Sequence, residues 1–246
     1  MSERTKCSTR RANYNSLLGE QEFFVTPLLR SSIEESLESI GVPKKGAMVL
    51  DIGAGECPLR EKLEQLGYRY FSLDIEQNSS RTIDYLARID RTLPDLLISD
   101  AGFDLLILTE VLEHVPDWKV AFQNLALLLK PGGHCLITTP FFYMLHEEPY
   151  DFWRPTDHAL RSFAESNGLE VVLSRRNGDG WDVLGTLLCS TSVCRRKKSF
   201  FAHLVTLPIW CIHGMLKAFF KSRFLQEVVD FQMRYYLGNF IILRKK

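Results

Sequence analysis

The strongest constraint on the fold of this chain is an apolar run that ends in a pair of glycines and leads into a helix. Residues 48–52 are apolar apart from Asp51, and Gly53 and Gly55 follow directly. Glycine lets the backbone turn sharply and approach a ligand closely, because it has no Cβ. Pro58 then suits the first turn of a helix. This order predicts a buried strand whose carboxyl end opens onto a ligand site.

The segments that follow repeat this alternation of short apolar strands and helices. The expected strands are 48–52, 70–73, 103–108, 135–138 and 169–173, and the expected helices are 28–40, 59–66, 120–129 and 156–167. Such alternation predicts an α/β fold in which a doubly wound, mostly parallel sheet carries helices on both faces. Ligands bind beyond the carboxyl ends of the strands in sheets of this type.

The acid Asp74 ends the second expected strand, nineteen residues after Gly55. An acid at this place can accept both hydroxyls of a ribose, which fits either a nicotinamide dinucleotide or S-adenosylmethionine. Two residues favour the second ligand. Pro58 stands where a pyrophosphate loop needs its third glycine, and the carboxylate of Asp51 would attract a cationic ligand and repel a pyrophosphate.

Four motifs resemble those of class I S-adenosylmethionine-dependent methyltransferases, in the same order and with similar spacing. They are VLDIGAGECP (49–58), FSLDIE (71–76), FDLLILTEVLEHVPD (103–117) and LLKPGGHCLITTPF (128–141). The resemblance covers roughly residues 45–175 and is greatest to the group that includes the ubiquinone-biosynthesis methyltransferases. It implies a Rossmann-like sheet of seven strands, with residues 236–244 as an antiparallel last strand, and S-adenosyl-L-methionine as the cofactor.

The resemblance also implies which residues hold the cofactor. Asp51, Gly53 and Gly55 would hold the methionine end, and Thr109 and Glu110 would line the same side. Asp74 would bind the ribose and Ile75 would lie against the adenine. The family's contact to the adenine amine falls on Arg88 or Asp90, and we take Asp90 as the candidate.

The acceptor site is expected in the loop 140–156, just beyond a strand. Its run H-x-x-P-Y-D-F-W-R-x-T, which begins at His146, resembles a signature of bacterial methyltransferases associated with cell-surface polysaccharide synthesis. We therefore expect Tyr150, Trp153 and Arg154 to bind the acceptor, and His114 or His146 to act as the base. The alternative is a rigid loop in which Arg154 pairs with an acid, while His114 only orients its own loop.

Charge and cysteine content restrict the setting of the protein. The net charge of zero combines a basic tail, +9 over residues 190–246, with an acidic body. An asymmetry of this kind suggests that the tail faces an anionic partner. The six cysteines form no C-x-x-C pair or zinc spacing, so we expect reduced thiols in the cytoplasm and no metal site. The polar start predicts no secretory signal, and we expect no nucleic-acid partner.

An apolar segment near the carboxyl end, residues 199–216, is framed by basic residues. Its helical spacing places Cys211, Ile212, Met215, Leu216, Phe219 and Phe220 on one stripe, and His213, Lys217 and Lys221 opposite. A basic amphipathic helix with aromatic residues favours attachment of residues 195–223 to an anionic membrane surface. The alternatives are a lid on the domain or a homodimer face.

These observations predict four segments and one main function. The segments are an N-terminal helical part (1–45), the cofactor-binding core (46–182), a basic apolar helical insertion (183–235) and the last strand (236–246). The predicted function is methyl transfer, preferably to oxygen, on a small or lipid-linked acceptor of saccharide, isoprenoid or aromatic type. The alternatives are a non-catalytic, membrane-recruited cofactor-binding partner and a nicotinamide-dependent oxidoreductase.

Overall fold

One sheet of seven strands organises this computed structural model, which describes residues 22–99, 102–191, 200–229 and 235–246. The strand order is β3-β2-β1-β4-β5-β7-β6. The strands are β1 (Met48–Ile52), β2 (Arg69–Asp74), β3 (Tyr85–Leu86), β4 (Phe103–Thr109), β5 (Leu129–Pro140), β6 (Leu169–Asn177) and β7 (Gly238–Lys245). The order turns back at β1, so chain segments from both halves of the sheet meet beside β1 and β4.

The pairing of the strands confirms the predicted fold class. β1 pairs in parallel with β2 and β4, and β4 pairs in parallel with β5. β7 is inserted between β5 and β6 and runs antiparallel to both, with Ile137 of β5 opposite Ile241. The sheet is therefore mostly parallel, with an antiparallel last strand.

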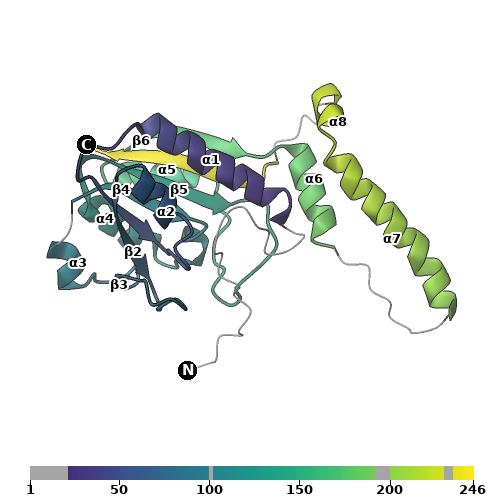
Figure 1. Ribbon diagram of the computed structural model, residues 1–246, viewed down its shortest axis with the longest axis horizontal. Coiled ribbons are helices and arrows are strands. Elements are labelled where there is room, and N and C mark those ends of the chain that lie inside the picture. The colour runs from purple at the N-terminus through teal and green to yellow at the C-terminus, as the bar shows by residue number, and fades with distance from the viewer. Residues whose placement is uncertain (1–21, 100–101, 192–199, 230–234) are drawn as a thin grey trace.

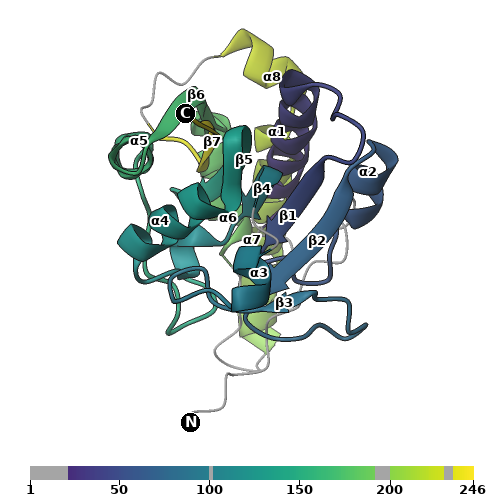
Figure 2. The same cartoon turned by 90° about the vertical axis from the view of Figure 1, so that its left-hand side faces the viewer.

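Helices cover both faces of the sheet, because its central strands are apolar on both sides (Figure 2). Leu105 and Ile107 of β4 pack in one core with α1 (Val25–Ile40) and α2 (Arg60–Gln65). Leu106 and Leu108 pack in the other core, with residues of α3 (Asp95–Ser99), α4 (Trp118–Leu128) and α5 (Asp157–Ser166). The alternation follows from the two-residue period of a strand.

The structure departs from the sequence expectation at Pro131, Gly132 and Gly133. The sequence predicts a helix that reaches residue 129 and a strand over 135–138, but these three residues already lie inside β5, which starts at Leu129. A Cβ on Gly133 would lie 3.0 Å from the carbonyl oxygens of Phe103 and Lys130. Gly133 thus allows the irregular start of β5 to pass close to β4, where the register shifts.

Three further helices follow β6 and extend away from the sheet (Figure 1). They are α6 (Gly180–Cys189), α7 (Phe200–Phe220) and α8 (Arg223–Val228). Val183 of α6 packs with Phe24 and Leu237, which anchors α6 to the domain. None of the helices in the described part of the chain is long and apolar enough to cross a membrane. The basic run 195–198 lies outside the described residues.

The packing of α4 gives a direct test of the core. Phe122 is fully buried, whereas Leu127 in the same helix is 51% exposed. Phe122→Ala should lower the free energy of unfolding by about 3–5 kcal/mol, because it leaves a cavity in a closely packed core. Leu127→Ala, the matched control, should change it by less than about 1 kcal/mol. Urea unfolding followed by circular dichroism measures both, and equal effects would contradict this packing.

Candidate functional site

The glycine loop between β1 and α2 lies against the segment that follows β4. Gly53 and Gly55 take left-handed conformations, with φ of 72° and 54°, and the Gly53 amide donates to the Leu73 carbonyl over 2.7 Å. A Cβ on Gly53 would lie 2.5 Å from Cγ2 of Val111. A larger residue would strain the backbone and push the two loops apart, so this approach requires glycine.

Asp74, at the end of β2, joins the glycine loop to the next turn. Its Oδ2 accepts a hydrogen bond from the Gly55 amide over 2.9 Å, and its Oδ1 accepts one from the Ile75 amide over 2.7 Å. Ile75 is 45% exposed and offers an apolar surface beside this carboxylate. The structure therefore brings together the residues expected to hold the ribose and the adenine.

Asp51, expected to attract the cationic end of the cofactor, is buried between β1 and β2. Its carboxylate accepts a hydrogen bond from the Tyr70 hydroxyl over 2.7 Å. Burial, opposed by this bond, raises the pKa of Asp51 to about 7. Asp51 is 2% exposed, so its side chain offers a ligand almost no surface for direct contact.

Asp90, the candidate for the adenine amine, is also buried, and an arginine binds both of its oxygens. Arg88 donates to Asp90 Oδ1 and Oδ2, each over 3.0 Å. Burial works against ionisation, but the hydrogen bonds and charge of Arg88 keep the pKa of Asp90 below its usual value. The Arg88 side chain is 41% exposed, against 2% for Asp90. Of the two alternatives, Arg88 is the one that a ligand can reach more easily.

β4 ends at Thr109, and Glu110 leaves it in a left-handed conformation, with φ of 55°. The Glu110 amide donates to the carbonyl and hydroxyl oxygens of Thr138 on β5, over 3.2 and 3.1 Å. These bonds direct the segment after Glu110 toward the loop that follows β5. A left-handed conformation costs a residue other than glycine roughly 1–2 kcal/mol, so the surrounding contacts hold it in place.

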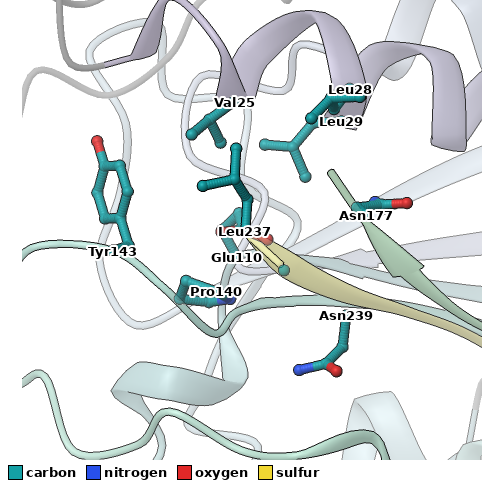
Figure 3. Close-up of a pocket in the computed structure, with 10 residues that line it drawn as sticks. Val25, Leu28, Leu29, Glu110, Pro140, Tyr143, Asn177, Leu237 and Asn239 are labelled. Atoms are coloured by element: carbon teal, nitrogen blue, oxygen red, sulfur yellow. The ribbon is translucent and has the colours of Figure 1, made fainter. Parts of the chain in front are cut away.

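Glu110 also lines a small, open pocket between α1 and the ends of β5, β6 and β7. Figure 3 shows Val25, Leu28 and Leu29 of α1 along one side and Tyr143 at one end. The other lining residues are Pro140, Asn177, Leu237, Gly238 and Asn239. Sequence reasoning did not find this pocket, because it joins segments that lie far apart in the chain. Glu110 is the predicted cofactor residue that reaches it.

The loop after β5 is held by Arg154, one of the predicted acceptor residues. Its two terminal nitrogens donate to both oxygens of Asp151 over 2.6 and 2.7 Å, and it also donates to the carbonyl of Met144 over 3.0 Å. This is the pairing named above as the alternative for Arg154. The guanidinium fixes the loop, while it is still 21% exposed.

Three aromatic side chains of the same loop stay partly open to solvent. Tyr150, Phe152 and Trp153 are 39%, 44% and 42% exposed. The Trp153 indole nitrogen donates to the Val115 carbonyl over 2.9 Å, and its ring lies 5.6 Å from that of Trp118. These contacts fix the ring of Trp153 while leaving part of its surface open to a ligand.

The two candidate bases, His114 and His146, lie side by side with a residue that sequence reasoning missed. Their ring centroids are 4.8 Å apart, and Glu113 Oε1 lies 3.8 Å from Nε2 of His114 and 4.0 Å from Nε2 of His146. The Glu113 carboxylate is fully buried, which raises its pKa well above the usual value. In the sequence, only its position next to His114 in EVLEHVPD pointed to Glu113 as a site residue. The burial of Glu113 depends on the fold.

Comparison with known proteins places these features in a family. Residues 24–177, more than half of the chain, match the family model described as a methyltransferase domain. Over an alignment of 106 positions the chain is 34% identical to the ubiquinone biosynthesis O-methyltransferase of Xanthomonas oryzae pv. oryzae, and this alignment covers 38% of this chain and 43% of that relative. The chain thus matches less than half the length of such relatives.

Solved structures agree with the fold at low sequence identity. A SAM-dependent methyltransferase from Archaeoglobus fulgidus is 15% identical, with a TM-score of 0.52 over 92% of this chain and 97% of that one. The 1,6-didemethyltoxoflavin-N1-methyltransferase of Burkholderia thailandensis, solved with S-adenosylhomocysteine, is 14% identical, with a TM-score of 0.52 over 89% and 78% of the two chains. Together with the matched family model and the four motifs around the glycine loop, these findings show that the chain belongs to the methyltransferase domain family, among the class I S-adenosylmethionine-dependent methyltransferases.

Proposed function

We propose that this protein transfers the methyl group of S-adenosylmethionine to a hydroxyl oxygen of a small or lipid-linked acceptor. One observation carries this proposal: the imidazoles of His114 and His146 lie side by side in the loops after β4 and β5, and the half-exposed aromatic residues Tyr150, Phe152 and Trp153 are joined to the turn 113–115 by hydrogen bonds. Aromatic faces interspersed with polar groups suit a sugar ring or an aromatic acceptor.

Methyl transfer needs the acceptor to be aligned with the donor and to lose one proton. Burial, followed by the charge of His114, lowers the pKa of His146. His146 is therefore neutral at pH 7 and able to accept a proton from a hydroxyl. His114 stands beside it and is 20% exposed. This pair supports oxygen as the methylated atom.

The place of the pocket supports a lipid-linked acceptor. Leu237 lines the pocket and also belongs to the apolar cluster that joins α6 to the domain. Phe220, the last residue of α7, packs against the same cluster. The apolar cluster that contains Leu237 therefore contacts both the pocket and the carboxyl end of α7. An acceptor delivered along α7 would arrive beside the pocket.

The exposed face of α7 supports attachment to a membrane surface. His213 Nε2 lies 3.0 Å from the Leu188 carbonyl oxygen of α6, so the His213 side of the helix faces the domain. The opposite side leaves large apolar side chains in solvent, among them Ile212 (56% exposed) and Met215 (72%). We infer that this surface lies on the cytoplasmic face of an anionic membrane; a lid and a homodimer face are the alternatives.

The cofactor residues can be tested by binding alone. Asp74→Ala should weaken the binding of S-adenosylhomocysteine by about 1.5–3 kcal/mol, because it removes charge-assisted hydrogen bonds. Asp74→Asn keeps one acceptor oxygen for the loop amides and tests the charge itself. Glu76→Gln, on the same turn, is the matched control and should have little effect. Calorimetry measures all three. Equal affinity of the wild type for NAD would contradict the assignment and favour the oxidoreductase.

The acceptor residues should affect turnover more than cofactor binding. Tyr150→Ala, Trp153→Ala and Arg154→Ala should each reduce transfer of labelled methyl groups into a cell extract that lacks this protein. Their affinity for S-adenosylhomocysteine should stay within about threefold of wild type, roughly 0.65 kcal/mol. Val42→Ala, at a position that is 93% exposed, is the control. Mass spectrometry of the labelled product identifies the acceptor.

If these variants lose affinity for the cofactor but keep normal turnover at saturating cofactor, then Tyr150, Trp153 and Arg154 bind the cofactor and not the acceptor. A wild type that binds the cofactor but labels nothing in any extract would favour the non-catalytic partner.

Membrane attachment predicts a defined response to salt. The protein should float with anionic liposomes at low salt, because each Lys or Arg near the surface contributes about 1 kcal/mol. It should be partly released at 1 M salt, where the Debye length is about 3 Å. Replacing Arg195, Arg196, Lys197 and Lys198 with Gln, or Ile212 and Met215 with Glu, should release it further, whereas Val42→Glu should not. If the wild type does not float with anionic liposomes at low salt, the lid or the homodimer face is the better interpretation of α7.

A further inference from the structure

Three side chains from two loops converge beside the pocket, and each has a metal-ligand atom. Glu113 and His114 belong to the short 3-10 helix Leu112–His114 that follows β4, and His146 belongs to the loop after β5. One ligand atom from each lies within 4.8 Å of the other two. Two imidazoles and one carboxylate are a ligand set that transition metals prefer.

The Glu113 carboxylate lacks the partners that a buried charge needs. It is fully buried, and neither of its oxygens has a hydrogen-bond partner among the described residues. A buried ionised carboxylate is costly unless it is paired or bound to a metal. Arg154 is close enough to act on it electrostatically, but both of its terminal nitrogens bind Asp151. Burial thus leaves the carboxylate of Glu113 facing the two imidazoles.

The hydrogen bonds of the imidazoles turn their lone pairs toward Glu113. His114 Nδ1 lies 2.9 Å from the Tyr150 carbonyl oxygen, which can only accept a hydrogen bond, so Nδ1 carries the proton. His146 Nδ1 lies 3.3 Å from the Met144 carbonyl and from a carboxylate oxygen of Asp151, two acceptors that are nearer than the Arg154 Nη2 donor at 3.5 Å, so this nitrogen also carries the proton. Both Nε2 atoms then present lone pairs to Glu113, at distances too long for a hydrogen bond.

We propose that Glu113, His114 and His146 bind a divalent transition-metal ion of the zinc class. Metal-bound histidines in proteins donate their other ring nitrogen to a carbonyl or carboxylate, as both do here. Ligand atoms of a tetrahedral zinc site are about 3.3 Å apart, so small rotations of these side chains would close the site. Sequence analysis expected no metal, because the fold and not the spacing brings His146 to the other two.

Three protein ligands leave one position for an exogenous oxygen. Tyr143, which lines the pocket, lies with its ring 5.4 Å from that of His146, so the three ligands border the pocket, and an open position on that side would be accessible from it. If the proposed function holds, the acceptor hydroxyl binds there and loses its proton to water, because the metal lowers its pKa. The oxygen then forms a bond to the methyl carbon, the carbon–sulfur bond breaks, and S-adenosylhomocysteine leaves. In this case His114 and His146 would promote loss of the proton as ligands of the metal and would not accept the proton themselves.

Zinc binding by the full chain tests the site without any acceptor. Protein freed of metal by a chelator should take up a single Zn²⁺ in calorimetry, and Co²⁺ in its place should give the visible spectrum of a tetrahedral site. His114→Ala, His146→Ala and Glu113→Gln should each weaken zinc binding at least about tenfold. His158→Ala removes a histidine whose side chain is 81% exposed and should leave it unchanged. Circular dichroism and S-adenosylhomocysteine affinity report folding of each variant.

Two results would overturn the metal site: a wild type that takes up no Zn²⁺, or a Glu113→Gln protein that binds zinc as tightly as the wild type. The second is informative even if the histidine variants fold poorly, because glutamine has the shape of glutamate. If zinc binds tightly but methyl transfer is unchanged in zinc-free enzyme, the activating role is wrong and the site stands. Because zinc binding is measured without any acceptor, a failure to find an acceptor would count against the proposed function and not against the metal site.

Discussion

The close approach of the Gly53 backbone to the Val111 side chain brings the ends of β1 and β4 together, and the arrangement of the site depends on it. The parallel pairing of these strands puts their carboxyl ends at one edge of the sheet. A side chain at Gly53 would meet Val111 at 2.5 Å. Because the loop can come this close, the segment from Glu110 to His114 passes directly from the cofactor loop to the pocket and the histidines.

The buried acids around this edge differ in how their charge is compensated. Asp90 is bound by Arg88, Asp151 is bound by Arg154, and Asp51 accepts a hydrogen bond from Tyr70. These pairings connect neighbouring segments of the chain, and in each of them the partner side chain compensates the carboxylate that it binds. Glu113 is the exception among these four, because its oxygens have no such bond among the described residues. This contrast sets Glu113 apart from the paired acids of the same region.

The apolar cluster at the base of α6 connects the site to the outer surface of the protein. Phe24 before α1, Val183 on α6 and Leu237 before β7 pack together, and Leu237 reaches the pocket. α7 is held against α6 through His213 and through contacts of Phe219 and Phe220 with the Trp181 ring. Its exposed apolar side therefore has a fixed orientation relative to the pocket, which is what delivery of a lipid-linked acceptor would need.

The sequence by itself determined most strands of the sheet, though not the short β3, because local patterns report local structure. The run 48–52 is β1 as predicted, and the Gly53–Gly55 pair follows it directly. Asp74 and Thr109 are the last residues of β2 and β4, where the motifs predicted strand ends. Only the tertiary structure decided which polar groups are buried and which meet. Glu113 and His146 are thirty-three residues apart, and the pocket combines α1 with three strand ends. Such contacts depend on how loops from different strands fold over one another, which no spacing in the chain encodes.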